Sequence, residues 1–430
     1  MVDAQGSPGG FWHQVADFSR VRQPLSSFGL GAHSIQDWQP EISHAHRATV
    51  LAYCEHVLAD HILPSGRVSY FPKCEVRSDG TIVSISTGQT QKTAITQRLV
   101  KTTQSTRAFR TSHIPCFSVS GPVEVLHPRA LSSHRSFLAR QYDMYCILGS
   151  GRMATETALY LLKANIHHEQ IRWVKSREAW ALSAASKAYS PERLKVQAAM
   201  SLDGLRLMSL AQTEQELCLG LERLGVLRRI SSDAEPRGFS QQMLTAADAA
   251  RLNTIKGVLR KGHVHAISEI GMLLDEGAVP IPYRTLYIDC TGSLGTPPKA
   301  AKIFQDGAIQ LADVHLCQPS FSAAMIAAIE LLDLSDQEKN ALCAPVHGSD
   351  ITTLFLTSIL NNHAWFHDGG VRKWLATCRL DRFLQHAAHE INRLAEIPRD
   401  LRTIRAVLPR AIINLERLLE LSGANDPINS

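Results

Sequence analysis

The residues whose types and spacing could do chemistry are concentrated in one turn, Gly149-Ser150-Gly151-Arg152-Met153-Ala154. The first glycine allows a tight turn, the second lets the backbone approach a pyrophosphate, and the small Ala154 lets a helix pack closely on a strand. Unpaired N–H groups and the positive dipole end of a helix N-terminus attract phosphates. The turn therefore predicts a dinucleotide phosphate site, with Gly149, Ser150, Gly151, Arg152 and Met153 as its contacts.

A polar stretch, Lys175-Ser176-Arg177, follows roughly twenty residues beyond the start of this turn. An NAD site places a carboxylate at that distance to bind the ribose 2′-hydroxyl. A hydroxyl between two cations suits a 2′-phosphate instead, and the guanidinium of Arg177 can bind it through two hydrogen bonds. The pattern predicts NADP as the cofactor, with a solvated basic loop as the alternative interpretation.

These polar residues need a strand, a turn and a helix to position them, and the neighbouring sequence supplies all three. Apolar runs at Met144–Leu148 and Ile171–Val174 predict buried parallel strands, and Leu159 lies at the start of an expected helix. A further stretch, 286–292, predicts a buried strand that ends in Asp289-Cys290-Thr291-Gly292. Helical spacing recurs at 45–63, 190–226, 373–397 and 401–421. Alternating strands and helices predict an α/β fold.

Composition limits the kind of protein that this is. The chain has 430 residues, 44% of them hydrophobic and 20% charged, which is enough for two domains and a large core. Its net charge of +5 is mild and spread along the chain, which argues against a nucleic-acid surface. The nine cysteines form no CxxC pair and the histidines no HExxH-like pattern, so we expect reduced thiols, a cytoplasmic location and no metal site. We also expect no membrane span and no signal peptide.

Several stretches carry a family resemblance. They are Ser7-Pro8-Gly9-Gly10-Phe11-Trp12, 20–24, 112–115, 177–180 and 289–292, together with the glycine turn. The chain resembles flavin-containing-monooxygenase-like oxidoreductases, which have two Rossmann-like dinucleotide-binding domains. The resemblance implies a first FAD-binding part at 1–140 and an NADP-binding domain with a helical insertion at 141–285. A second FAD-binding part with C-terminal helices is then expected at 286–430.

The resemblance also implies which residues contact FAD. Asp3 takes the position that binds the adenosine ribose, while Trp12 and Gln23 fall in the segment after it. Thr291 and Gly292 take positions near the flavin pyrophosphate or ribityl chain. The strand–GxGxxG–helix unit that should precede Asp3, and that forms the middle of its sheet, does not occur before it. We therefore expect either a start at an internal Met or a decayed relative.

These features predict an FAD-dependent, NADPH-using oxidoreductase, monooxygenase-like, that acts on a small organic substrate. The alternative is a non-catalytic or degenerate NADP-binding protein that does not retain FAD, and a third hypothesis is a truncated product that does not fold. Because the two cofactors carry the chemistry in such enzymes, no protein nucleophile or acid–base pair is required. The sequence assigns no catalytic residue, no particular substrate and no oligomeric state.

Overall fold

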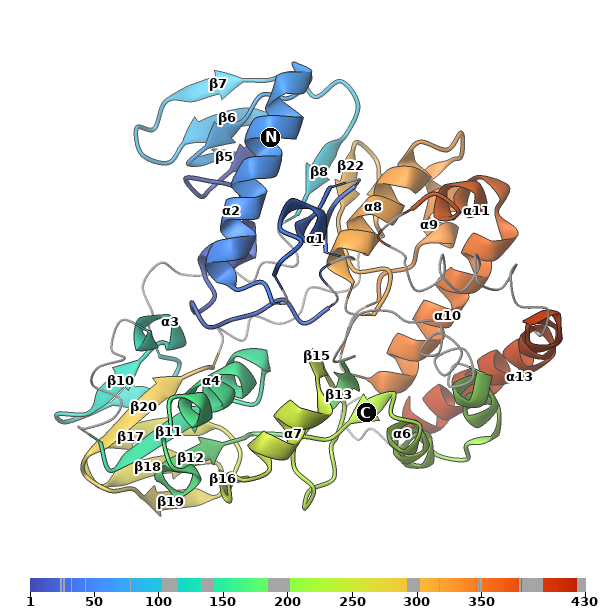
Figure 1. The fold of residues 1–430 in the computed structure, drawn as a ribbon. Helices are drawn as coiled ribbons and strands as arrows, with labels where there is room; N and C mark the ends of the chain where they lie inside the picture. Colours follow the sequence, from blue (N-terminus) through green and yellow to red (C-terminus); the bar gives the residue numbers. More distant parts are fainter. Residues whose placement is uncertain are drawn as a thin grey trace.

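Figure 1 shows the chain as a computed structural model. It describes residues 1–23, 25, 28–31, 33–42, 44–77, 79–102, 115–132, 142–184, 202–291, 302–316, 318–346, 348, 350–378, 380 and 397–423. Residues 112–114 of the predicted turn at 112–115 lie outside these residues. Within the described ranges, no helix combines the length and the hydropathy that crossing a membrane requires.

The centre of the fold is a five-stranded parallel sheet in the order β10-β20-β11-β12-β16. Its strands are Glu124–Leu126 (β10), Thr285–Asp289 (β20), Met144–Leu148 (β11), Ile171–Val174 (β12) and Gly257–Leu259 (β16). Every residue of β11 and β20 is buried, because a parallel sheet is covered on both faces and its inner strands are apolar throughout. The expected α/β class and the buried strands at 144–148, 171–174 and 286–289 are confirmed.

Helix α4 (Arg152–Lys163) follows β11 directly and packs on this sheet. Its small residues Ala154 and Ala158 are fully buried with Tyr145 and Ile147 of β11. Helix α7 (Ala246–Leu252) also contacts α4, and its Leu252 is buried in the same core cluster. The close approach that small residues permit places the first turn of α4 against the end of β11.

Two strands of this sheet differ from the expectation. The segment 286–292 was expected to lead the chain out of the NADP-binding part, but β20 pairs with β11 along its whole length, from Met144↔Thr285 to Leu148↔Asp289. No element was predicted for the segment 122–140, but it contains β10 and the short helix α3 (Pro128–Leu131). Strand β10 is a three-residue edge strand that is only partly buried, and it is too short to show a strand pattern in its sequence.

The N-terminal part is built from short ladders and one longer helix (Figure 1). Strand β8 (Leu99–Lys101) pairs in parallel with β22 (Ala308–Gln310), so the chain returns to the same ladder after the central sheet. The other elements here are β1 (Val2–Asp3), η1 (Gly10–His13), β2 (Gly29–Leu30), β3 (His33–Ser34), α1 (Ile35–Trp38), α2 (Arg47–Val57), η3 (Leu58–Ile62), η4 (Leu63–Ser65), β4 (Phe71–Pro72), β5 (Cys74–Val76), β6 (Thr81–Ser84), β7 (Thr90–Lys92) and β21 (Phe304–Gln305).

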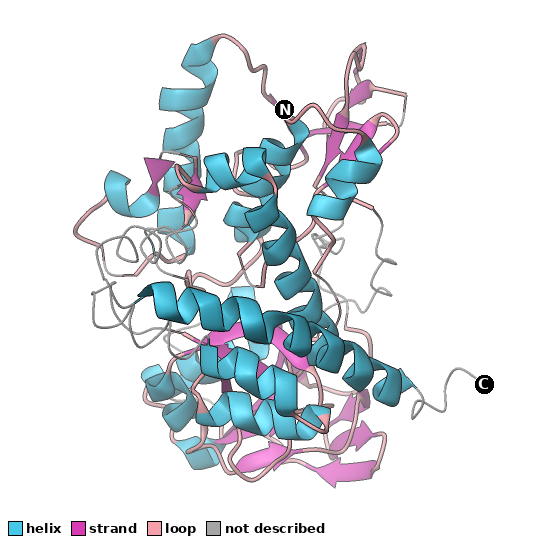
Figure 2. Ribbon diagram, turned by 90° about the vertical axis from the view of Figure 1, so that its right-hand side faces the viewer, coloured by secondary structure: helices cyan, strands magenta, loops and turns pink. Residues whose placement is uncertain are grey.

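The C-terminal part is helical, and Figure 2 shows helices filling the middle of the molecule between two groups of strands. Its helices are α8 (Pro319–Glu330), α9 (Asp336–Leu342), α10 (Ile351–His367), α11 (Gly369–Leu375) and α13 (Ile397–Gly423). Helices α10 and α13 pack together, which confirms the long helix expected at 401–421. Most of the helix expected at 373–397 lies outside the described residues.

Two small sheets complete the fold. The first has the order β14-β13-β15, with bounds Leu227–Arg228, Trp180–Ser183 and Phe239–Leu244. Helix α6 (Glu214–Arg223) contacts it. The second has the order β19-β18-β17-β9, with bounds Gly277–Pro280, Gly271–Leu274, Val264–Ser268 and Ser118–Val119. The short helix η5 (His168–Gln170) precedes β12.

Candidate functional site

The glycine turn lies at the carboxyl end of β11, between the ends of β12 and β20. Gly149 has φ of +122°, and a Cβ on it would lie 3.1 Å from the carbonyl carbon and oxygen of Cys290. Its N–H donates to the Val174 carbonyl at 2.9 Å, and its own carbonyl accepts the indole N–H of Trp173 at 2.9 Å. Both the conformation and the lack of room require glycine here.

Helix α4 begins immediately after this turn with an uncapped N-terminus. Gly151 is the N-cap, and no side chain caps the described helix there. A Cβ on Gly151 would meet no atom within 4 Å, so the space in front of the helix is open. The first N–H groups of α4 therefore face a space that an anion can enter. Met153, the second residue of the helix, is half-buried beside this opening.

The structure brings the glycine turn and the predicted ribose end together. The Ser150 hydroxyl lies 3.4 Å from the Ser176 hydroxyl and accepts the backbone N–H of Arg177 at 3.3 Å. Ser176 and Arg177 are both exposed. An exposed serine and an exposed arginine thus follow β12 next to the turn, and the backbone of the arginine contacts the turn directly.

Lys175 is not at this surface. Its side chain is 1% exposed, and its ammonium donates to Glu178 at 2.8 Å and lies 4.3 Å from the centre of the Trp173 ring. Arg260 pairs with the second Glu178 oxygen at 2.9 Å. Burial lowers the pKa of Lys175, although Glu178 opposes that effect. The ammonium is committed to a buried ion pair, so the structure does not bring Lys175 to the predicted phosphate position.

Thr291, assigned to the flavin by resemblance, lies beside the glycine turn. Its backbone N–H donates to the Asp289 carboxylate at 2.8 Å, and its hydroxyl donates to the same oxygen. The exposed Cys116 thiol lies 3.5 Å from that hydroxyl. Thr291 therefore belongs geometrically to the Gly149 end of the sheet. Gly292 lies outside the described residues.

Asp3, the predicted FAD ribose residue, ends the short strand β1, which pairs with β4. Its carboxylate accepts the Gln5 N–H at 2.8 Å and the Tyr70 hydroxyl at 3.5 Å. Burial, and then the Asp3 carboxylate, raise the pKa of Tyr70 to about 12. Asp3 is half-buried and does not line the cavity that Trp12 and Gln23 share.

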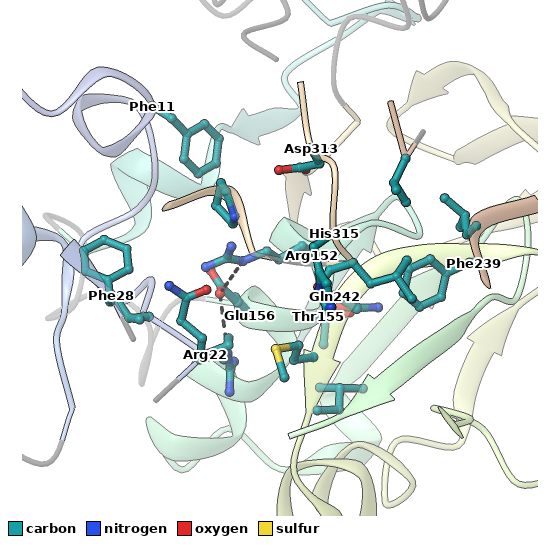
Figure 3. A pocket seen from close by; sticks show the side chains of 18 of the residues that line it. Phe11, Arg22, Phe28, Arg152, Thr155, Glu156, Phe239, Gln242, Asp313 and His315 are labelled. Atoms are coloured by element: carbon teal, nitrogen blue, oxygen red, sulfur yellow. Dashed lines mark hydrogen bonds and ion pairs between the residues drawn. The ribbon is translucent and has the colours of Figure 1, made fainter. Parts of the chain in front are cut away.

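That cavity is the second part of the candidate site. It has a volume of about 230 Å³ and brings Trp12 and Gln23 together with Arg152 of α4. Figure 3 shows Phe11 and Phe28 on one side of the cavity and Phe239 on the other. The wall also contains Arg22, Thr155, Glu156, Gln242, Asp313 and His315. Three residues that the sequence assigned to two different cofactors therefore line one space.

A buried carboxylate joins the two sides of this cavity. The side chain of Glu156 is 3% exposed and lies 3.0 Å from the Arg152 guanidinium and 3.7 Å from that of Arg22 (Figure 3). Arg22 also pairs with Asp248 of α7 at 2.8 Å, and Arg152 donates to the Arg20 carbonyl at 2.8 Å. Arg152 is thus engaged with the N-terminal segment rather than with the space in front of α4.

Sequence reasoning missed the cavity residues Gln242, Asp313 and His315. Burial raises the pKa of Asp313 to about 6, and burial lowers the pKa of His315. The three residues stand in no recognisable motif, and the cavity forms only when distant segments fold together. Gln242 is one of three polar residues in the strand sequence Phe-Ser-Gln-Gln-Met-Leu, so the sequence gives it no distinguishing signal.

No protein-family model matches the chain. Uncharacterized proteins of Mycobacterium bovis and Mycobacterium tuberculosis are 27% identical to it over 394 residues, which cover 89% of this chain and 72% of each relative. Within the described residues, no group of three His, Cys, Asp or Glu side chains could hold a metal ion.

Three solved structures resemble the chain. A complex of OTEMO with FAD and NADP has a TM-score of 0.46 and 13% identity and covers 77% of this chain and 79% of its own. An oxidized steroid monooxygenase bound to NADP has a TM-score of 0.45 and 10% identity and covers 98% and 92%. A Rhodococcus cyclohexanone monooxygenase bound to NADP⁺ has a TM-score of 0.42 and 12% identity and covers 68% and 65%. Identities this low and TM-scores below 0.5 transfer neither a ligand nor an activity to this chain.

Proposed function

We propose that this chain binds NADP(H) at the end of its central parallel sheet. The observation that carries the proposal is the Gly149 turn, whose positive φ and close contact with Cys290 require glycine directly before the uncapped N-terminus of α4. The pyrophosphate would lie against the first N–H groups of that helix. Ser150, Gly151 and Met153 surround the opening.

The choice of NADP over NAD rests on the exposed end of the site. Ser176 and Arg177 lie at the surface next to Ser150, and a planar guanidinium binds a phosphate through two parallel hydrogen bonds. An NAD site would have a carboxylate just after the second strand, but no acidic residue stands between Val174 and Arg177 in this part of the described chain. Arg177 would therefore carry most of the preference for the 2′-phosphate.

We further propose that the protein is an FAD-dependent, monooxygenase-like oxidoreductase with a small organic substrate. Bound FAD would supply the redox chemistry, with NADPH as the source of the hydride. In this chain, Trp12 and Gln23 would contact the flavin where they line the cavity beside Arg152, and Asp3 would hold the ribose through its carboxylate. The aromatic walls of the cavity would exclude water.

A second candidate function is NADP binding without FAD. Two observations favour it: Asp3 already accepts two hydrogen bonds, and the cavity of about 230 Å³ is smaller than the roughly 300–1,000 Å³ that whole ligands occupy. A purified protein with flavin absorbance supports the first candidate. A colourless protein that binds NADPH supports the second.

The experiment that tests NADP binding uses Arg177→Glu. We expect its Kd for NADPH to rise at least tenfold while its Kd for NADH changes little, because only NADPH carries the 2′-phosphate. Arg67→Glu makes the same charge change at an exposed residue of the N-terminal part and serves as the control. An unchanged preference for NADPH in Arg177→Glu would refute the assignment.

A further inference from the structure

Arg20 lies in an extended segment of the N-terminal part, and its side chain faces α4. Antiparallel pairing of Arg20 with His46 holds the segment extended. On one side of Arg20, the ring of Phe18 stacks on that of Tyr160 in α4, with 4.2 Å between the ring centres. On the other side, Arg22 forms an ion pair with the same helix (Figure 3). Because residues two apart in an extended segment share a side, Arg20 faces α4 as its two neighbours do.

The guanidinium of Arg20 has no counter-ion in the described part of the chain. Arg20 is half-buried, and its side chain makes no hydrogen bond or ion pair with another described residue. The nearby acids are engaged elsewhere: Asp248 pairs with Arg22 at 2.8 Å. Glu156 lies 3.0 Å from Arg152 and 3.7 Å from Arg22. Taking a charge out of water is costly unless a counter-ion replaces the water, so Arg20 is suited to binding an anion from outside.

Two further cations stand near Arg20. Lys163 is the last residue of α4, and Arg251 lies one turn after Asp248 in α7, the helix that packs on α4. Both side chains are exposed, and neither forms a hydrogen bond or an ion pair within the described ranges. Partial burial, and then the charge of Arg20, lower the pKa of Lys163, and Arg251 adds to this effect while Asp248 opposes it. Three cations without counter-ions therefore lie close enough together to repel one another.

This arrangement of cations suits a phosphate group. A guanidinium binds phosphate through two parallel hydrogen bonds, and an ammonium adds a compact point charge. The carboxylates of Glu156 and Asp248 act on Arg20 as well, so the positive surface is small and bordered by negative charge. A long nucleic-acid backbone would meet those carboxylates, whereas a single phosphate would contact the cations alone. The chemistry therefore favours a compact dianion.

The cluster is separate from the site at the glycine turn. Lys163 lies about 16 Å along α4 from Arg152, which begins the helix. Neither Arg20, Lys163 nor Arg251 lines the cavity. We propose that Arg20, Lys163 and Arg251 form an anion site that binds a phosphate group, as the free ion or as a phosphate monoester. The bound phosphate joins the N-terminal segment to α4 and α7, and this site does not depend on the proposed NADP function.

The test compares two double variants of the full chain. Lys163→Gln with Arg251→Gln removes the two exposed cations of the site, and Lys92→Gln with Arg67→Gln makes the same charge change at exposed residues of the N-terminal part. Inorganic phosphate is titrated into each protein by calorimetry, with chloride keeping the ionic strength constant. The wild type and the control should bind with a Kd of about 1 mM, and the Kd should rise at least tenfold in the site variant. Any phosphate at the glycine turn is common to all three proteins.

Thermal unfolding separates ligand binding from a structural role of the same cations. In chloride alone, the site variant should unfold at the wild-type temperature or above it, because it has lost like charges without partners. Phosphate should raise the unfolding temperature of the wild type and of the control but not that of the site variant, since a ligand stabilises the state that it binds.

Three outcomes overturn the proposal: a wild type that does not bind phosphate, a site variant that binds it as tightly as the control, and a site variant that unfolds at a lower temperature in chloride. In the last case the cations would serve the fold and not a ligand. Glycerol 3-phosphate, titrated in the same way, identifies the form of the ligand. Binding of both compounds supports a site for phosphate monoesters, and binding of inorganic phosphate alone supports a site for the free ion.

Discussion

The hydrogen bond from the Trp173 indole to the Gly149 carbonyl offers the sharpest test of how the turn is held. Trp173 is 1% exposed in β12, and its N–H reaches the turn at 2.9 Å from the neighbouring strand. Trp173→Phe keeps an aromatic ring in the core but removes this donor. The Gly149 carbonyl then loses the partner that fixes the peptide plane before Ser150.

The loss of stability expected for Trp173→Phe has two contributions. A buried carbonyl left without its partner costs about 1–3 kcal/mol, and the space left by the smaller ring costs about 1 kcal/mol more. The free energy of unfolding should therefore fall by about 2–4 kcal/mol. Bound NADPH must restore the ordered conformation of the turn. If this costs about 1 kcal/mol of binding free energy, the Kd for NADPH rises about fivefold, because 1.4 kcal/mol corresponds to a tenfold change in Kd.

The assay combines urea unfolding with NADPH titration, and the chain contains a matched control. Trp365 of α10 is also fully buried, and its indole N–H donates to the Leu342 carbonyl at 2.6 Å, in the C-terminal core. Trp365→Phe should lose similar stability and bind NADPH as the wild type does. If Trp173→Phe also binds NADPH as the wild type does, the indole stabilises the core alone and the reasoning about the turn fails.

Two further predictions concern buried carboxyl groups. Glu156→Gln should lower the free energy of unfolding by about 3 kcal/mol, because it leaves two half-buried guanidiniums without their shared counter-ion. Glu222→Gln, in the more exposed pair with Arg229, should cost under about 1 kcal/mol in the same urea unfolding experiment, and equal losses would contradict this account. Burial, and then the Asp350 carboxylate, raise the pKa of Glu214 from 4.5 to about 7. The folded chain holds this proton more tightly, so the stability that it contributes is complete below about pH 4.5 and is lost as the pH rises towards 7. Glu214→Gln should flatten that slope in a pH series of urea unfolding, and an unchanged slope would show that other groups cause it.

The parts of the fold that the sequence predicted share one physical property. Strands β11, β12 and β20 are apolar runs buried on both faces, and α4 follows a glycine turn, so each carries its structure in its own residues. Strand β10 was missed because it is a short edge strand that forms only by pairing with the backbone of β20, which is distant in sequence. The sequence recognised 286–289 as a strand but not its partner, because strand order is decided by contacts between distant segments.

The residues of the candidate site likewise fall into those that a local sequence pattern predicts and those that only the folded chain brings together. Gly149, Ser150 and Gly151 were predictable because a turn between a strand and a helix fixes their roles locally. The cavity takes Trp12, Arg152, Gln242 and Asp313 from four separate segments, and no spacing rule connects them. The sequence could assign Trp12 to a cofactor by resemblance, but it could not place it opposite α4.

The inward position of Lys175 follows from the local geometry of a β-strand. Side chains alternate between the two faces of a strand, so residues two apart share a face. Trp173 is buried in β12, and Lys175 lies on the same face one step beyond the end of the strand, where its ammonium lies over the Trp173 ring and pairs with Glu178. Counting from Trp173 therefore places Lys175 beside a buried ring, whereas Ser176 and Arg177 are exposed. It follows that Lys175→Met should lower stability but not the preference for NADPH over NADH, whereas Arg177→Glu should do the reverse, and unfolding and binding measurements on the two variants decide between these roles.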